Sequence, residues 1–414
     1  MNIIFTICAK NYLASAISLK NSVEKTNSES LFYIILADEQ DGLADTVIQE
    51  NNIILARSIG INKYDEMAFK YDVVEFNTSV KPFAFRYFQN KENIEKIMYL
   101  DPDIYVYENL NEIWKRLDTY AIVLTPHVVD GVRRIQNNKL DATFLQYGIY
   151  NLGFVAISSS EEGRNIIDWW CNRLEEYCYM ETPYFVDQKW MDYIPALFPD
   201  VFIERSKKYN MAWWNFSERV MSQQEKGKVL DGMNENDVAF VHFSNFRPGM
   251  QVEYVRDRGC DISDEQLAIW KKLYNEYEQQ LIDNGYEKYS VMKYAYNYFS
   301  NGTKILKIHR KLLLQYLNEN EEKDYFDVKD GGFWLVLREC GLVKENGDNR
   351  DLEEYQTSVK AKSVNLSRKS KKQIVYNFLC KMYIKLFGIE KYQNLIGALE
   401  DKSKVTNQEF LLRR

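Results

Sequence analysis

The sequence predicts an α/β protein with a mainly α-helical C-terminal extension. The chain begins with an apolar run, Ile3–Cys8, then helical spacing over Tyr12–Val23 and a second apolar run, Leu31–Ala37. A strand–helix–strand start of this size is a βαβ unit, which predicts a largely parallel sheet. A further apolar run, Lys96–Leu100, has the length of a buried strand. After about Gly259 the composition changes, because helical spacing dominates and glycine and proline become scarce.

The remaining elements continue this pattern along the chain. Apolar spacing predicts, in order, helix Val80–Gln89, strand Lys96–Leu100, strand Ile104–Tyr107, helix Leu110–Leu117, strand Ala121–Leu124, strand Asn151–Ile157, helix Arg164–Tyr177 and strand Val238–Phe243. We therefore expect residues 1–258 to form the α/β domain and residues 259–414 the helical extension. A chain of 414 residues is long enough for two to three domains.

The composition is that of an ordinary globular protein, with 46% hydrophobic and 27% charged residues. The net charge of −7 disfavours a general nucleic-acid binder, so no nucleic-acid partner is expected. The six cysteines show no CxxC spacing, which predicts reduced thiols and neither a disulfide framework nor a zinc site. The N-terminal residues lack the pattern of a signal peptide, and no segment has the length of a membrane-spanning helix. A cytoplasmic location is the expectation.

Two carboxylates one residue apart, Asp101-Pro102-Asp103, follow the predicted strand that ends at Leu100. Ligands of open parallel sheets bind at such strand ends. Two aspartates there are costly to desolvate unless a cation lies between them, and a divalent cation holding a diphosphate meets this condition. His242, at the end of the last apolar strand, would complete a metal site. The alternatives are a solvated Asp-Pro-Asp turn and a core histidine bonded to a carbonyl.

The motifs in their order resemble those of a known family. They are Asn11-Tyr12, Tyr99-Leu100-Asp101-Pro102-Asp103, Tyr150-Asn151-Leu152-Gly153-Phe154, Asp187-Gln188 and His242-Phe243-Ser244. Together they resemble the GT-A glycosyltransferases, in the retaining branch that includes glycogenin and the bacterial lipopolysaccharide galactosyltransferases. The resemblance covers about residues 1–250 and implies a Rossmann-like nucleotide-diphospho-sugar transferase domain. The segment Tyr209–Asn215 also resembles bacterial proteins of cell-surface polysaccharide clusters.

The resemblance implies roles for individual residues. Asp101, Asp103 and His242 would bind Mn²⁺ or Mg²⁺, which bridges the two phosphates of the donor. The residues implied to contact the nucleotide sugar are Cys8, Asn11, Tyr12, Asp38, Lys81, Arg86, Asp101, Pro102, Asp103, Asn151, Gly153 and Arg247. Asp187, Gln188 and Lys81 would lie at the reacting sugar and serve catalysis. Lys10 departs from the pattern, because the galactosyltransferases usually carry an acid before the asparagine.

These roles imply a metal-dependent glycosyltransferase that moves a sugar from a UDP-sugar to a glycan, lipid-linked glycan or glycoprotein acceptor. The resemblance further implies retention of anomeric configuration and a place in cell-surface polysaccharide or glycoprotein synthesis. The alternative is a non-catalytic nucleotide-sugar-binding scaffold subunit of a glycan assembly complex.

Segment 360–387 is basic in an otherwise acidic chain and continues into apolar residues at helical spacing. This pattern is typical of a helix that lies peripherally on an anionic membrane, here the inner face. The alternative is a helix that docks on its own domain with a solvated basic face.

Overall fold

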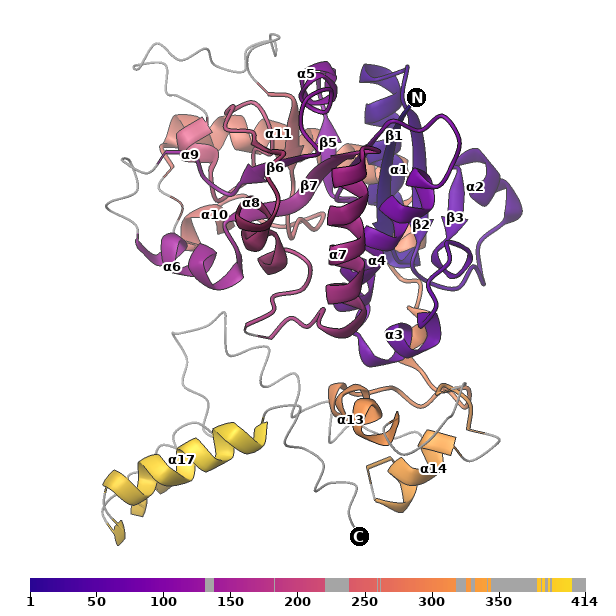
Figure 1. Ribbon diagram of the computed structural model, residues 1–414. Helices are drawn as coiled ribbons and strands as arrows, with labels where there is room; N and C mark the ends of the chain where they lie inside the picture. Colours follow the sequence, from indigo (N-terminus) through magenta and orange to yellow (C-terminus); the bar gives the residue numbers. More distant parts are fainter. Residues whose placement is uncertain are drawn as a thin grey trace. The chain divides into compact units, whose positions relative to one another are not determined.

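The structure is a computed structural model of the 414-residue chain (Figure 1). It describes residues 1–130, 138–181, 183–219, 238–258, 260, 262–317, 325–328, 332–340, 342–343, 378–380, 382–383, 386–387 and 389–403. The basic residues of segment 360–387, from Lys360 to Lys385, lie outside the described residues. No helix among the described residues is long and apolar enough to cross a membrane.

The chain forms two compact units. Unit 1 comprises Met1–Tyr64 and Val73–Ala295, and unit 2 comprises Asp65–Asp72 and Tyr296–Arg414. Unit 1 thus includes a long helix beyond residue 258. The division expected from the sequence, a catalytic domain at residues 1–258 and an extension at residues 259–414, concerns function and stays a prediction.

Unit 1 is built on a seven-stranded sheet in the order β3-β2-β1-β4-β7-β6-β8. The strands are β1 (Asn2–Cys8), β2 (Leu31–Leu36), β3 (Ile53–Leu55), β4 (Lys96–Leu100), β6 (Ile122–Pro126), β7 (Tyr150–Ser158) and β8 (Val201–Ile203). All run parallel except β7, which pairs antiparallel with both β4 and β6. The predicted α/β class and the largely parallel sheet are therefore confirmed. Strands β3 and β8 were not expected from the sequence, because three residues are too few to show a periodic pattern of apolar side chains.

The helices of unit 1 cover both faces of this sheet. They include α1 (Leu13–Thr26), α2 (Asp45–Glu50), α4 (Val73–Gln89), α5 (Asn111–Arg116), α6 (Asn138–Tyr147), α7 (Glu161–Glu176), α8 (Ile194–Leu197), α9 (Phe216–Arg219), α10 (Tyr254–Asp257), α11 (Asp264–Asp283) and α12 (Tyr286–Tyr289). Helix α3 (Tyr64–Lys70) begins in unit 1 and continues into unit 2. Helices α4 and α7 lie together on one face, where Phe85 of α4 contacts Phe5 of β1 edge to face, at 4.9 Å between ring centroids (Figure 1). Residues of α1 pack with Ile4 and Met98 on the other face.

A second, two-stranded sheet completes the environment of Asp103. Strand β5 (Ile104–Val106) pairs antiparallel with β9 (Phe240–His242), and Ile104 lies opposite His242. The backbone N–H of Phe243 donates to the carbonyl of Asp103 over 2.8 Å. Two segments about 140 positions apart in sequence are thus joined by this ladder. The ladder places His242 beside the Asp-Pro-Asp segment.

Unit 2 contains α13 (Lys307–Leu317), α14 (Gly332–Glu339) and α17 (Ile389–Ser403). Phe69, Phe299, Phe333 and other apolar side chains form its core. Arg310 is 4% exposed and donates to the carbonyls of Phe69, Tyr71 and Tyr296 within 2.6–2.8 Å. These bonds satisfy carbonyls that would otherwise be buried without a donor, so Arg310 serves to hold the unit together.

Candidate metal and sugar-nucleotide site

Asp101 and Asp103 follow the carboxyl end of β4, as the sequence predicts. The backbone N–H of Asp101 donates to the carbonyl of Gly153 over 2.8 Å, which extends the β4–β7 ladder by one residue. The Tyr99 hydroxyl donates to Asp101 Oδ1 over 2.6 Å. The Asp101 and Asp103 side chains are 28% and 19% exposed, so the pair remains accessible to a ligand from solvent. A solvated Asp-Pro-Asp turn, the alternative considered above, would not have these contacts to Gly153 and Tyr99.

His242 brings an imidazole to the two carboxylates. Its Nε2 lies 3.1 Å from Asp103 Oδ1 and 3.6 Å from Asp101 Oδ2. Its Nδ1 lies 3.2 Å from the Asn151 side-chain oxygen. Burial opposes the charged form of the ring, but Asp103 and Asp101 outweigh it and raise the pKa of His242. The histidine thus faces two acids and is not a core histidine bonded to a carbonyl.

The three side chains suit a divalent cation. One ligand atom from each of Asp101, Asp103 and His242 lies within 4.8 Å of the other two. Carboxylate oxygens favour hard cations such as Mg²⁺ and Mn²⁺, and a histidine nitrogen is a further ligand for Mn²⁺. Three protein ligands also leave coordination positions for the oxygens of a diphosphate. The described residues therefore fit the ion that the sequence implied.

Gly153 makes room for the His242 ring. A Cβ at this position would lie 2.5 Å from Cε1 and 2.6 Å from Nδ1 of His242, and 2.9 Å from the Asn151 side-chain oxygen. Only glycine allows such an approach without displacing the ring. The close backbone approach at Gly153 is therefore made to His242.

We expect Gly153→Ala to weaken cation binding. The new methyl group displaces His242 from Asp103, and misplacing a ligand in this way lowers metal affinity about tenfold or more. Titration of Mn²⁺ into the nucleotide-free protein measures the effect. Gly397→Ala in α17 is the control, because a Cβ there meets no atom within 4 Å. Equal affinity in the two variants would contradict the role assigned to Gly153.

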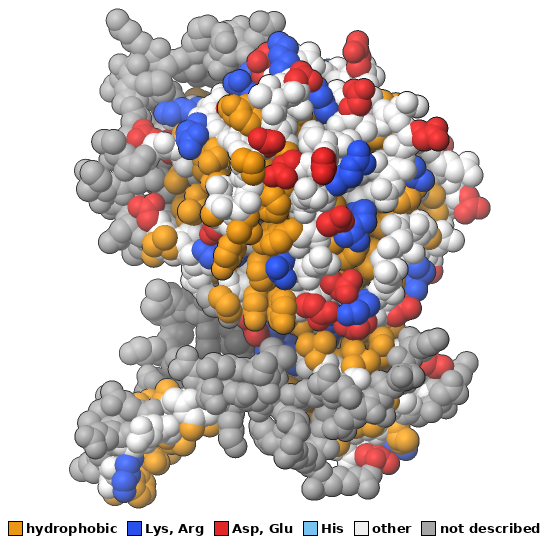
Figure 2. Space-filling view, in the orientation of Figure 1, with side chains coloured by type: hydrophobic (Ala, Val, Ile, Leu, Met, Phe, Trp, Pro, Cys, Tyr) orange, Lys and Arg blue, Asp and Glu red, His pale blue; other side chains and the backbone are white. Residues whose placement is uncertain are grey.

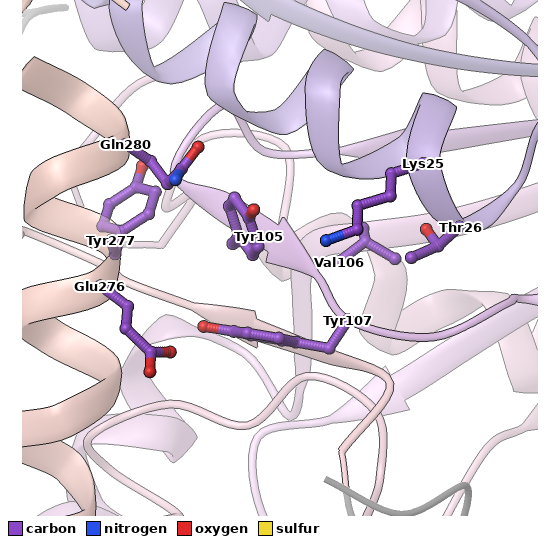
Figure 3. A pocket seen from close by; sticks show the side chains of 8 residues that line it. All are labelled: Lys25, Thr26, Tyr105, Val106, Tyr107, Glu276, Tyr277 and Gln280. Carbon is purple, nitrogen blue, oxygen red and sulfur yellow. The ribbon is translucent and has the colours of Figure 1, made fainter. Parts of the chain in front are cut away.

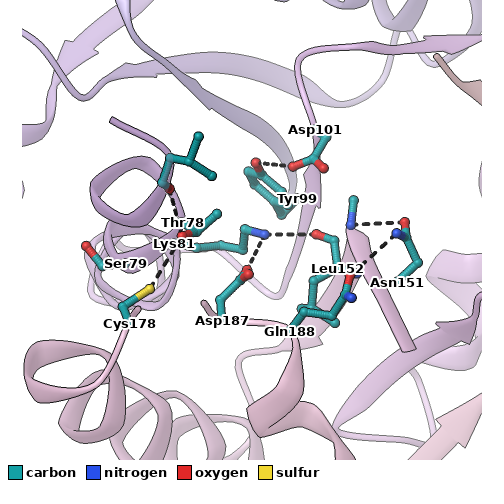
Figure 4. A network of polar contacts seen from close by, with 12 residues as sticks. Thr78, Ser79, Lys81, Tyr99, Asp101, Asn151, Leu152, Cys178, Asp187 and Gln188 are labelled. Carbon is teal, nitrogen blue, oxygen red and sulfur yellow. Dashed lines mark hydrogen bonds and ion pairs between the residues drawn. The ribbon is translucent and has the colours of Figure 1, made fainter. Parts of the chain in front are cut away.

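Lys81 and Asp187 form a buried ion pair beside this cluster. Lys81, on α4, is 1% exposed and Asp187 is 2% exposed, with Nζ 2.5 Å from Asp187 Oδ2. The same Nζ donates to the carbonyl of Leu152 over 2.8 Å and lies 4.1 Å from the centroid of the Tyr99 ring (Figure 4). Burial raises the pKa of Asp187, and Lys81 opposes this rise. Tyr99 contacts both Lys81 and Asp101, so it connects the ion pair to the acidic cluster.

Gln188 and Asn151 lie next to the ion pair and are also buried. Gln188 Oε1 accepts from the backbone N–H of Leu152 over 3.2 Å, in the network drawn in Figure 4. Its Nε2 donates to the carbonyl of Tyr147 over 3.0 Å. We call Asp101, Asp103 and His242 together the metal-type cluster. The structure brings this cluster into one continuous polar region with Lys81, Asp187, Gln188 and Asn151.

Asp38, after the end of β2, organises the loop that follows β1. Its carboxylate accepts from the backbone N–H groups of Lys10, Glu39 and Ala295 within 2.9–3.2 Å. Burial raises the pKa of Asp38 to about 6 against these bonds. The Lys10 ammonium pairs with Asp41 at 2.8 Å. Lys10, the departure from the family pattern, is therefore engaged by acids that follow β2.

The other candidates for the nucleotide take different positions. The side-chain oxygen of Asn11 is buried and has no hydrogen-bond partner among the described residues. Burial and the charge of Asp103 raise the pKa of Tyr12 to about 12, and Arg247 opposes this rise. Cys8 is buried in the core. Pro102 follows Asp101 in the short turn before β5.

Arg86 is not brought to the cluster. Its guanidinium pairs with Asp168 of α7 at 2.9 Å on the outer surface. The exposed Arg247 forms no ion pair with a carboxylate of the described residues. Of the three cations expected to contact the nucleotide sugar, Lys81 lies beside the acidic cluster, Arg86 does not, and Arg247 is exposed.

Three polar residues around His242 were not predicted from the sequence, namely His127, Asn210 and Asn215. His127 contacts the Asn151 amide, Asn210 donates to the Asn151 side-chain oxygen, and Asn215 binds the backbone of both His127 and Asn210. Asn210 and Asn215 lie in the segment Tyr209–Asn215, so the segment was a signal for them although it revealed no role. His127 gave no signal, because a lone histidine after a strand has no distinguishing context.

A cavity of about 260 Å³ lies between α1, β5 and α11 (Figure 3). Its walls include Tyr105 from β5, Tyr107 just after this strand, Tyr277 from α11, and the polar side chains Lys25, Glu276 and Gln280. None of these residues belongs to the metal-type cluster. The cavity nevertheless lies along the strand that follows Asp103.

Comparisons with known proteins find two curated relatives in one organism. No protein-family model matches the sequence. The chain is 23% identical over 248 residues to the uncharacterized protein YfnF of Bacillus subtilis (strain 168), covering 58% of this chain and 80% of YfnF. It is 24% identical over 212 residues to the uncharacterized protein YfnD of the same strain, covering 49% of this chain and 63% of YfnD.

Similar solved structures are sugar transferases. One is the galactosyltransferase LgtC in complex with donor and acceptor sugar analogues, with 18% identity, a TM-score of 0.40 and coverage of 67% of this chain and 96% of LgtC. Another is the glycosyltransferase GlyE of Streptococcus pneumoniae TIGR4, with 14% identity, a TM-score of 0.39 and coverage of 76% of this chain and 74% of GlyE. In its motifs and in these comparisons, the chain is similar to glycosyltransferases of the GT-A type.

Proposed function

We propose that this protein is a metal-dependent glycosyltransferase that uses a UDP-sugar. The observation that carries the proposal is the convergence of Asp101, Asp103 and His242 at the carboxyl end of a central strand, beside the buried Lys81–Asp187 pair. A bound Mn²⁺ or Mg²⁺ would supply charge stabilisation for a diphosphate leaving group. The partial exposure of both aspartates supports such a ligand.

The residues around the cluster suit the rest of the donor. The buried side-chain oxygen of Asn11 has no donor among the residues that the structure describes, and the N3–H of uracil would provide one. Tyr12, in the short turn that follows β1, offers an aromatic ring for the base. Lys81 carries a positive charge into a buried position beside the cluster, where it would stabilise negative charge more strongly than in water.

Asp187 and Gln188 are proposed to face the donor sugar. Asp187 is held in place by Lys81, and Gln188 by two backbone groups of neighbouring segments. Positioning of this kind lowers the barrier by orienting the reacting carbon toward the acceptor hydroxyl. We further propose retention of configuration, a glycan, lipid-linked glycan or glycoprotein acceptor, and a role in cell-surface polysaccharide or glycoprotein synthesis.

The non-catalytic scaffold is the competing function. Calorimetric titration of UDP into the protein with Mn²⁺, and again with EDTA, tests the site itself. We expect binding that requires the metal, followed by slow hydrolysis of at least one UDP-sugar in the presence of Mn²⁺. Metal-dependent UDP binding without turnover of any UDP-sugar would favour the scaffold. Equal UDP binding with and without metal would refute the proposed role of the cluster.

A peripheral contact with the inner face of the membrane is proposed for the C-terminal region. Apolar side chains remain exposed there, including Phe378, Leu386, Phe387 and, on α17, Leu395 and Leu399. Figure 2 shows hydrophobic side chains at the surface of α17. Exposed apolar residues next to a basic segment are typical of helices that bind anionic lipid surfaces.

We expect the protein to sediment with vesicles that contain phosphatidylglycerol, and less so as the salt concentration rises. Vesicles of phosphatidylcholine alone should leave it in the supernatant. Leu399→Asp should reduce sedimentation, because a charge on the apolar side opposes insertion. No sedimentation with anionic vesicles would instead favour docking of this segment on its own domain.

A further inference from the structure

The side-chain amide of Asn151 lies between two histidines, His242 and His127. We propose that Asn151 and Asn210 form a relay that fixes His242 with its Nε2 directed at Asp101 and Asp103. Both asparagines are positioning residues in this proposal, which rests on the metal site of the proposed function.

The oxygen of this amide is surrounded by donors. Asn151 Oδ1 accepts from the backbone N–H of Gly153 over 3.2 Å and from Asn210 Nδ2 over 3.1 Å. His242 Nδ1 lies 3.2 Å from the same oxygen. An amide nitrogen in this place would face two N–H donors and accept from neither. The surroundings therefore define which end of the amide faces His242.

The nitrogen of the amide is surrounded by acceptors. His127 Nδ1 lies 3.1 Å from the carbonyl oxygen of Ile149, which has no hydrogen to give, so Nδ1 carries the proton in the neutral ring. His127 Nε2 is then an acceptor, and Asn151 Nδ2 lies 3.3 Å from it. Gln188 Oε1 is a second acceptor at 3.5 Å. The contacts at the oxygen and the contacts at the nitrogen thus require the same orientation of the Asn151 amide. Each set of contacts supports this orientation without the other.

This orientation determines which ring nitrogen of the neutral His242 side chain carries the hydrogen. Because Asn151 Oδ1 accepts only, His242 Nδ1 must carry a hydrogen. The lone pair of the neutral ring is then on Nε2, the atom 3.1 Å from Asp103 and 3.6 Å from Asp101. Histidines that bind metals commonly donate the other ring N–H to such a partner, which fixes tautomer and ring orientation.

The segment Tyr209–Asn215 is shaped to present Asn210 to this amide. Asn210 is fully buried and has a φ of +55°, a left-handed conformation that asparagine tolerates better than most residues. Asn215 stabilises the turn, since its Oδ1 accepts from Ala212 N over 2.8 Å and its Nδ2 donates to the Asn210 carbonyl over 3.1 Å. The relay therefore extends from this turn to the His242 ring.

Asn210→Gly tests the relay while keeping the backbone free to adopt a positive φ. Asn52→Gly is the matched control, because Asn52 has a φ of +50° and its side chain binds the Phe32 carbonyl, with no contact to the cluster. We expect Asn210→Gly to lower Mn²⁺ affinity, measured without nucleotide, about tenfold relative to Asn52→Gly. Equal affinities in the two variants would overturn the proposal.

Nitrogen-15 NMR of histidine rings supplies a second readout. The chain has three histidines, so the Mg²⁺-saturated protein gives few ring signals. We expect the His242 signal to show a hydrogen on Nδ1 and none on Nε2, and the Nδ1 hydrogen to exchange faster in Asn210→Gly. A hydrogen on Nε2 in the unmodified protein would overturn the relay even if UDP-sugar turnover is normal. Conversely, normal cation binding and the expected signal without turnover would refute the proposed enzyme activity and leave the relay standing.

Discussion

Asp103→Asn is expected to abolish metal-dependent UDP binding and sugar transfer while leaving the fold intact. Asparagine keeps the shape of the side chain and removes the charge that faces His242 Nε2 at 3.1 Å. Loss of a residue behind the ligands commonly costs 10- to 100-fold in metal affinity, so loss of a ligand should cost about 100-fold or more. The backbone carbonyl of Asp103 still accepts from Phe243, so the β5–β9 ladder does not depend on the carboxylate.

The thermal stability of this variant discriminates between a lost ligand and a damaged fold. In EDTA, we expect Asp103→Asn to melt no lower than the unmodified protein, because one of two neighbouring negative charges has been removed. With saturating Mn²⁺ only the unmodified protein should gain stability, since a ligand stabilises the state that binds it. Asp264→Asn on α11, where the carboxylate is 96% exposed, is the control and should retain the gain. Full transfer by Asp103→Asn in metal-free buffer would refute the metal-dependent mechanism.

Lys81→Met is expected to produce the largest loss of stability among single substitutions near the site. It leaves Asp187, 2% exposed, without the ammonium that lies 2.5 Å from it. Breaking a buried ion pair at one partner typically costs about 3–5 kcal/mol. The carbonyl of Leu152 also loses its donor. Urea denaturation of the two proteins measures the free energy of unfolding, and transfer activity should be lost as well.

The pH dependence of this loss follows from Asp187. Burial raises the pKa of Asp187 in the folded protein, and removing Lys81 raises it further. A folded-state pKa above the unfolded value means that the folded protein binds the proton more tightly, so stability increases as the pH falls through that pKa. The deficit of Lys81→Met should therefore be smaller at pH 5 than at pH 8. A deficit that does not change with pH would indicate that Asp187 is not the cause.

A double substitution separates stability from function. Lys81→Met combined with Asp187→Leu removes both charges, and such replacements are often neutral or stabilising. We expect the double variant to recover most of the lost free energy of unfolding but none of the sugar transfer. Recovery of transfer together with stability would show that Lys81 and Asp187 serve the fold alone.

Local sequence determined much of the fold. The apolar runs that became β1, β2, β4 and β7 are buried in the sheet, and a strand buried on both faces must be apolar along its whole length. The helical spacing at α1, α4 and α7 likewise reflects faces that pack on the sheet. The direction of β7 was not evident, because an apolar run reads the same in either direction. Its antiparallel pairing with β4 depends on the path of the intervening chain.

The three candidate metal ligands were evident from the sequence, since Asp101, Asp103 and His242 each lie at or near the end of an apolar run. The side chains that surround them became evident from the packing of the chain. The β5–β9 pairing brings His242 to the aspartates, Gly153 provides space for its ring, and the turn at Asn210 orients the amide beneath it. These contacts join residues 50 to 140 positions apart. The periodicity of apolar residues reports only on neighbours within one helix or strand. The direction of a hydrogen bond and the missing Cβ of Gly153 matter between elements, so they become evident only once the chain has packed.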